Sequence, residues 1–139
     1  MPKSEGSVII NAPVEKVFDA AADPKIIEQV SSGKLVDTTG INGELGSYSD
    51  WEYLKLRSRT TVSEVNKPYK LVQELTGAMS GKWIWNLEQD GQAVKVDFCI
   101  EYSVPGGILG KIADKLFLAR INRKNMEKSM YGLKAYCEK

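Results

Sequence analysis

The longest pattern in the chain is an apolar stripe that runs from Ile108 to Cys137. Its residues recur at steps of three and four, which is the spacing of one face of an α-helix. The stripe consists of Leu109, Ile112, Leu116, Ala119, Arg123, Met126, Met130, Leu133 and Cys137. All of them are apolar or small except Arg123. At ~1.5 Å per residue the pattern predicts a helix about 45 Å long, which must lie on a surface supplied by the rest of the chain.

Two short helices are predicted near the start of the chain. Ser7–Ile10 reads as a first strand, and Asn11-Ala12-Pro13 then begins a helix, since proline is favoured in the first turn. Asp23-Pro24 ends this helix and opens a second one that reaches Val30. The first strand is therefore expected to be followed by a pair of short helices.

The middle of the chain is predicted to be strands. The segments are Lys34–Thr38, Gly46–Arg57, Arg59–Val65, Tyr69–Leu75 and a final hairpin. In the hairpin, Asp90-Gly91 is a strong two-residue turn signal, which places Leu87 opposite Val94, Trp85 opposite Val96 and Trp83 opposite Phe98. All large apolar residues then share one face, and Lys82 and Lys95 lie on the other, so a slip of one residue would destroy the sorting.

This order of elements predicts an α+β fold, with helices gathered on one face of an antiparallel sheet. A chain of 139 residues is expected to form one domain over residues 1–139. The net charge is +1, but the segment from Ile108 onward carries eight Lys/Arg against three Asp/Glu. No apolar run reaches the ~18 residues that span a bilayer, and no hydrophobic signal segment opens the chain. Two cysteines are too few for a disulfide framework, so we expect a cytoplasmic protein.

Several stretches match a known family. They are Val8–Asp19, Asp23-Pro24, Tyr102–Lys111 and Leu133-Lys134. On these residues the sequence resembles the START-like (SRPBCC) superfamily, in particular its polyketide cyclase/dehydrase and lipid-transport branch. The resemblance covers the whole chain and implies the helix-grip fold. In that fold a curved antiparallel sheet of about six to seven strands wraps the long C-terminal helix, two short helices follow the first strand, and a cavity opens between sheet and helix.

The residue types exclude several kinds of catalytic site. The chain has no histidine, which removes Ser-His-Asp and Cys-His arrangements and any histidine-ligated zinc site. Two cysteines without histidine make a metal site improbable, and the glycine–lysine stretches lack the spacing of a phosphate loop. We therefore predict no metal and no cofactor.

Two placements stay open at this stage. Asp50 and Glu52 share a strand parity with Tyr48 and Leu54. If that parity faces inward, the two acids project into the cavity, where they could transfer protons. If the parity switches, Trp51 points inward and the acids lie in solvent. Arg123 either extends outward to water or reaches into the cavity to pair with a carboxylate of the protein or the ligand.

The function predicted from these observations is the binding of a small hydrophobic or amphipathic molecule between the sheet and the C-terminal helix. The candidate ligand-binding residues are Tyr48, Leu54, Trp83, Trp85, Phe98, Tyr102, Leu116, Arg123, Met126 and Met130. One alternative is a cyclase or dehydratase acting on a polyketide-like substrate, with Asp50, Glu52, Tyr48 and Tyr102 as candidates for proton transfer. Another is an interaction module that uses the basic face of the long helix. No nucleic-acid partner is expected, and a monomer is favoured.

Overall fold

A computed structural model describes residues 3–31, 33–53, 55–103 and 115–139, the last range without the side chains of residues 115–119, 121 and 122. The elements are β1 (Lys3–Ile10), α1 (Val14–Ala22), α2 (Pro24–Val30), β2 (Lys34–Thr39), β3 (Tyr48–Tyr53), β4 (Leu56–Asn66), β5 (Lys70–Gly77), β6 (Ser80–Asp90), β7 (Ala93–Ser103) and α4 (Lys115–Cys137). This is the α+β order that the hydrophobic pattern predicts.

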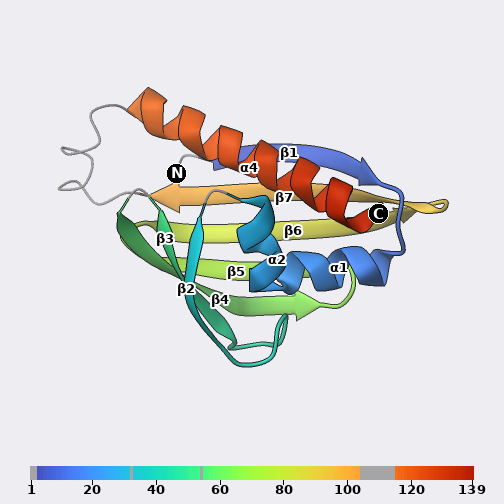
Figure 1. Ribbon diagram of the computed structural model, residues 1–139, viewed down its shortest axis with the longest axis horizontal. Helices are drawn as coiled ribbons and strands as arrows, with labels where there is room; N and C mark the ends of the chain where they lie inside the picture. Colours follow the sequence, from blue (N-terminus) through green and yellow to red (C-terminus); the bar gives the residue numbers. More distant parts are fainter. Residues whose placement is uncertain (1–2, 32, 54, 104–114) are drawn as a thin grey trace.

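The seven strands form one antiparallel sheet in the order β1-β7-β6-β5-β4-β3-β2. Figure 1 shows α4 running along β1 and β7, with α1 and α2 in front of the middle strands. β2 and β3 cross in front of the ends of the other strands, so the sheet is curved around its helices (Figure 1). The helix-grip architecture implied by the resemblance is confirmed.

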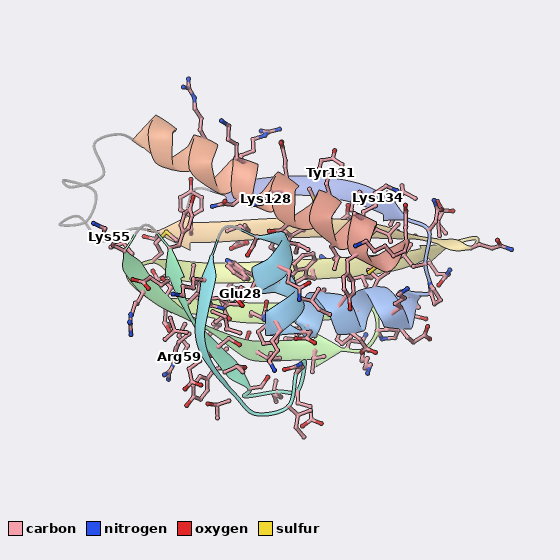
Figure 2. The ribbon with its side chains drawn as sticks, in the orientation of Figure 1. Glu28, Lys55, Arg59, Lys128, Tyr131 and Lys134 are labelled. Carbon is pink, nitrogen blue, oxygen red and sulfur yellow. The ribbon has the colours of Figure 1, made fainter. Side chains whose placement is uncertain are left out.

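A carboxylate of helix α2 is hydrogen-bonded to the edge strand of the sheet. The Glu28 side chain accepts a hydrogen bond from the backbone N–H of Leu35 in β2, with 2.7 Å between nitrogen and oxygen. Glu28 is labelled on α2 in Figure 2. This bond holds the first helix pair close to the strand that closes the curved sheet.

Alternation along β7 separates an inner face from an outer face. Its buried residues are Val94, Val96, Phe98, Ile100 and Tyr102. The residues between them, such as Lys95 and Glu101, point away from the helices, because successive side chains of a strand face opposite ways. The apolar face of the sheet is therefore the one that the described helices α1, α2 and α4 cover.

The last hairpin turns one residue later than the sequence predicts. Asp90 pairs with Ala93, so Gly91 and Gln92 form the turn. Gly91 has φ +63° and Gln92 is not among the residues with positive φ, which suits a type II′ turn with glycine at its first central position. A type I′ turn at Asp90-Gly91 would have required a positive φ at Asp90 as well.

The corrected turn moves every cross-strand pair of the hairpin by two residues. Trp85 lies opposite Phe98, Trp83 opposite Ile100 and Leu87 opposite Val96. Because side chains alternate with period two, an even shift leaves each residue on its predicted face. Lys82 and Lys95 are exposed, as predicted.

The predicted strand from Gly46 to Arg57 is two strands. Tyr53 at the end of β3 pairs with Leu56 at the start of β4. Lys55 between them has φ +64°, a left-handed conformation that is rare outside glycine and marks the reversal of the chain. Beyond the reversal the parity changes, so Leu56 shares the inner face with Tyr53 and Trp51.

The C-terminal helix packs mainly on β1. Met126 and Met130 are 1% and 2% exposed, which confirms that they are buried against the sheet. Their terminal methyl groups lie at the position that a Cβ on Gly6 of β1 would approach. Gly132 of α4 likewise allows a close approach to α2, because a Cβ on Gly132 would lie 2.6 Å from the Cβ of Val30. The predicted helical residues 108–114 lie outside the described residues.

Candidate functional site

The main cavity lies between the inner face of the sheet and the helices α2 and α4. Its volume is about 100 Å³. Its described lining consists of Ile27, Ser31, Gly33, Trp51, Tyr53, Leu56, Ser58, Leu75, Met79, Trp83, Trp85, Phe98, Ile100, Tyr102, Asn125 and Ser129. Most of this wall is aromatic or aliphatic, which is the usual character of a site for an apolar ligand.

Aromatic rings from the neighbouring strands β6 and β7, joined across the curved sheet by a ring from β3, form one continuous wall. Trp85 stacks on Phe98, with ring centroids 3.8 Å apart and planes inclined by 8°. Trp83 meets Phe98 edge-on at 6.3 Å and lies 6.4 Å from Trp51. Cross-strand register explains the cluster, because Trp85 and Phe98 are a direct pair and Trp83 is the next residue on the same face.

A second, smaller hollow of about 20 Å³ adjoins the first. Both are bordered by Ile27, Trp51, Trp83 and Trp85. The remaining wall of the smaller hollow combines apolar residues of α1 and β4 with a set of polar residues, Thr38, Asn42, Ser47, Ser49, Thr60 and Gln73. The two hollows together make a site with an apolar chamber and a smaller, more polar chamber, called the polar chamber below, on either side of the tryptophans.

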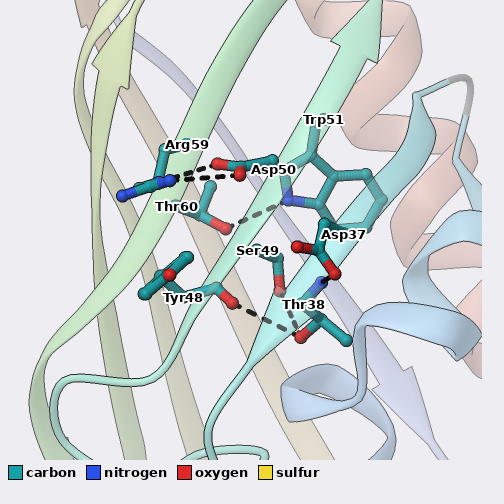
Figure 3. Close-up of polar contacts among 8 residues, drawn as sticks. All are labelled: Asp37, Thr38, Tyr48, Ser49, Asp50, Trp51, Arg59 and Thr60. Atoms are coloured by element: carbon teal, nitrogen blue, oxygen red, sulfur yellow. Dashed lines mark hydrogen bonds and ion pairs between the residues drawn. The ribbon is translucent and has the colours of Figure 1, made fainter.

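Hydrogen bonds order the polar chamber (Figure 3). The indole N–H of Trp51 donates to Oγ1 of Thr60 at 3.0 Å, and both residues are buried. The hydroxyl oxygens of Thr38 and Ser49 lie 3.1 Å apart. Each of these groups has a partner, as buried polar groups generally do.

The indole N–H of Trp85, unlike that of Trp51, is not satisfied by a hydrogen bond within the described residues. Trp85 is 1% exposed, and its indole N–H is the one buried side-chain donor without a hydrogen-bond partner among the described residues. Leaving a buried donor unpaired costs about 1–3 kcal/mol. A sequence cannot disclose such a donor, since it depends on what the folded chain brings to the ring.

The described walls of both chambers contain no lysine, arginine, aspartate or glutamate. Their polar groups are hydroxyls, amides and indoles, which donate and accept hydrogen bonds without carrying charge at neutral pH. In the main cavity the hydroxyl and amide groups come from the sheet, from the segment after α2 and from α4, and they belong to Tyr53, Ser58, Tyr102, Ser31, Asn125 and Ser129. The site therefore suits an uncharged ligand better than an ion.

The two acidic candidates of β3 lie on the outer face of the sheet. The Arg59 guanidinium donates two hydrogen bonds to Asp50, at 2.7 and 3.1 Å, and these hold the pKa of the Asp50 carboxyl below its usual value. Glu52 lies opposite Arg57 on the same side. Figure 3 shows the Asp50–Arg59 pair and the Trp51 ring on opposite sides of β3. The solvent-facing interpretation of the acids is confirmed.

The ring of Tyr48 lies on the outer face of the sheet, as Asp50 and Glu52 do. The Arg59 guanidinium lies over its ring, 4.0 Å from the centroid. Tyr48 borders the smaller hollow, but its ring packs on Arg59 and does not join the aromatic wall. Tyr48 is not among the described lining residues of the main cavity, so its predicted part in ligand binding rests on the smaller hollow and stays a prediction.

Four predicted ligand-binding residues meet in the main cavity, namely Trp83, Trp85, Phe98 and Tyr102. Met126 and Met130 lie instead in the core between α4 and β1. Two others cannot be placed: Leu54 and the Leu116 side chain lie outside the described residues.

Arg123 is not part of the cavity. Its side chain is 71% exposed and pairs with Glu127 one turn later, at 3.4 Å. The hypothesis that it reaches inward for an anionic group is corrected by this position. Met126, one turn further on, already lies over Gly6 near the start of β1. In Figure 1 the preceding part of α4 diverges from the sheet, so Arg123 extends to water.

Several lining residues were not singled out from the sequence. With the correct hairpin turn, Ile100 could have been predicted as a lining residue, since it is the cross-strand partner of Trp83. Asn125 and Ser129 lie one residue before the buried methionines and carried no apolar signal. Ile27 lies on a predicted helix whose position over the cavity depends on the packing of α2 against α4.

The cysteines do not form a reactive or metal-binding centre in the described part of the chain. Burial raises the pKa of both the Cys99 and the Cys137 thiol, which disfavours the nucleophilic thiolate. Within residues 3–31, 33–53, 55–103 and 115–139 no three His, Cys, Asp or Glu side chains gather in a way that could hold a metal ion.

A family model described as "Polyketide cyclase / dehydrase and lipid transport" matches residues 1–138. The chain belongs to this family. The likeness to the START-like superfamily noted in the sequence is thereby confirmed. No curated protein matches the chain. None of the described helices is long and apolar enough to cross a membrane.

Solved structures share the fold of this family member at low sequence identity. Protein BH1534 of Bacillus halodurans has a TM-score of 0.76 and 17% identity, over 99% of this chain and 98% of that one. The Aha1 dimer of Colwellia psychrerythraea has a TM-score of 0.74 and 16% identity, over 99% and 97%. DynU16, a putative protein of the dynemicin biosynthetic locus, has a TM-score of 0.66 and 18% identity, over 96% and 46%. At these identities the likeness establishes the fold alone.

Proposed function

We propose that this family member binds a small, largely apolar molecule in the cavity between the sheet and the helices α2 and α4. The observation that carries the proposal is the aromatic wall, in which Trp83, Trp85 and Phe98 border open volume. Protein interiors are normally close-packed, and Met126 and Met130 fill the neighbouring core in the ordinary way. An engineered cavity of about 150 Å³ binds benzene, so the volume of about 100 Å³ suits one small ring, and because the cavity is not closed, a second fused ring of the ligand extends toward its mouth.

The cyclase or dehydratase alternative has less support from these contacts. Such chemistry needs a proton donor and acceptor within reach of the substrate. Of the four candidates, Tyr102 alone lines the main cavity, while Asp50, Glu52 and the Tyr48 ring lie on the outer face. Asp50→Asn is therefore expected to leave ligand binding unchanged. Turnover of a cyclisable substrate that is lost in Asp50→Asn would favour the enzyme instead.

The interaction-module alternative rests on the outer side of α4. Lys124 is exposed, and Lys128 and Tyr131 are labelled on this helix in Figure 2. A cytoplasmic, monomeric protein stays our prediction, although one structure with the same fold is that of a dimer.

Native mass spectrometry of freshly purified protein, followed by titration with the neutral bicyclic hydrocarbon tetralin, tests the proposal. Ser58→Phe fills the cavity from β4, and the matched control Thr61→Phe places the same ring on the outer face of the same strand. We expect at least a tenfold loss of tetralin affinity in Ser58→Phe and none in Thr61→Phe. Equal affinities in the two variants would place binding elsewhere.

A further inference from the structure

The indole N–H of Trp85 is a buried donor on a residue that lies at the boundary between the two chambers. The ring borders both the apolar cavity and the smaller polar hollow. Its N–H has no hydrogen-bond partner among the described residues, although the residue is 1% exposed. The comparable donor of Trp51, on the same face of the sheet, is satisfied by Thr60. Folding thus leaves one donor unpaired, among the described residues, on a ring that borders the cavity.

We propose, on the basis of the function proposed above, that the ligand carries an uncharged acceptor oxygen, such as a ring ketone, and that this oxygen accepts a hydrogen bond from Trp85. Satisfying a buried donor in this way adds both affinity and orientation to an otherwise apolar contact. Trp85 is then the residue that selects among apolar molecules of similar shape.

The dimensions of the polar chamber limit the size of that acceptor. A cavity needs roughly 10–15 Å³ of free volume to hold one water molecule, and the polar chamber has about 20 Å³. A single oxygen substituent fits this space, whereas a bulky polar group does not. The apolar body of the ligand remains in the main cavity, where the stacked pair of Trp85 and Phe98 forms the wall.

The absence of charge in the described walls sets the chemical class. A carboxylate in either chamber would lose its hydration without meeting a lysine or arginine of the described lining. Arg123, the cation that the sequence suggested for this purpose, pairs with Glu127 in solvent. The ligand class is therefore a neutral cyclic ketone or ether, and fatty acids and other anions are disfavoured.

The test compares 1-tetralone, which has a ring ketone, with tetralin, which has the same rings without the oxygen. Isothermal titration of wild type and Trp85→Phe gives a ratio of affinities for the two probes in each protein. One net hydrogen bond corresponds to about two- to tenfold in affinity, so the tetralone-to-tetralin ratio should fall by this factor in Trp85→Phe. Trp83→Phe is the matched control and should keep the wild-type ratio. Tetralin-1-carboxylate should bind wild type at least tenfold more weakly than tetralin.

An NMR measurement on wild type keeps the proposal testable if Trp85→Phe does not fold. The indole N–H resonance of Trp85 should move further downfield with tetralone than with tetralin, because only tetralone offers it an acceptor oxygen. Probes that bind with a ratio unchanged by Trp85→Phe, or an indole resonance that does not respond, would overturn the role of Trp85 alone. Wild type that binds neither neutral probe would overturn the proposed function itself.

Discussion

Met130 provides the most direct measure of how firmly the sheet and the C-terminal helix grip each other. It is 2% exposed, and its terminal methyl group lies over Gly6, where β1 has no side chain. Truncating a buried methionine to alanine costs about 2–5 kcal/mol, more when the site cannot collapse. All eight residues of β1 are paired with β7, so the strand cannot move to fill the void. We therefore expect Met130→Ala to lower the free energy of unfolding by an amount in the upper half of that range.

A double-mutant cycle with Gly6 tests the contact itself. In the wild type, a Cβ on Gly6 would collide with the Met130 methyl and lie 3.0 Å from that of Met126. The resulting overpacking, about 1–3 kcal/mol, opposes the gain of about 0.5–1 kcal/mol from replacing glycine in a strand. Gly6→Ala should thus be neutral or mildly destabilising alone, but stabilising by about 0.5–1 kcal/mol in Met130→Ala.

Urea unfolding followed by tryptophan fluorescence gives all four free energies of unfolding from the midpoint and slope. Tyr131→Ala, at the next residue and 59% exposed, is the control and should change stability by less than about 0.5 kcal/mol. A Met130→Ala cost no larger than that of the control, or strictly additive effects of Gly6→Ala and Met130→Ala, would refute this account of the grip.

Two further predictions concern the ends of the helices. Gly132→Ala should lower the free energy of unfolding by about 1 kcal/mol. The new Cβ would lie 2.6 Å from the Cβ of Val30, and this overpacking outweighs the better helix propensity of alanine. An increase in the urea midpoint of unfolding would contradict this prediction. Glu138 accepts hydrogen bonds from the backbone N–H of Asn11 and from Lys134, which lower its pKa. Its stabilising effect should be present above its ordinary pKa and lost as pH falls through the lowered one, so the melting temperatures of wild type and Glu138→Gln should differ at pH 7 and converge in acid. A difference that persists in strong acid, after the Glu138 carboxylate is protonated, would argue against this linkage.

Much of the architecture is determined by the sequence alone. The period of three to four residues in the last segment specifies a helix, and the alternation along β6 and β7 specifies which residues face it. These features survive the error of one residue in the turn at Gly91, since an even shift of pairing preserves the faces. The aromatic part of the candidate site, Trp83, Trp85 and Phe98, could be predicted for the same reason.

Other parts of the site were decided by tertiary structure. The reversal at Lys55, a residue without the usual preference for a left-handed backbone, gave no turn signal, yet it determines that Trp51 faces inward and Asp50 pairs with Arg59 outside. Arg123 has the helical phase of a buried residue, but the divergence of α4 from the sheet places it in water.

The two features that carry the functional proposals depend most on packing in three dimensions. The position of α2 against Gly132 of α4 brings Ile27 over the cavity. Whether an indole N–H finds a partner depends on which residue lies across from it: Thr60 supplies one to Trp51, and the described chain supplies none to Trp85. Periodicity encodes the direction of a side chain, whereas the space and the partners around it arise only when all elements are packed together.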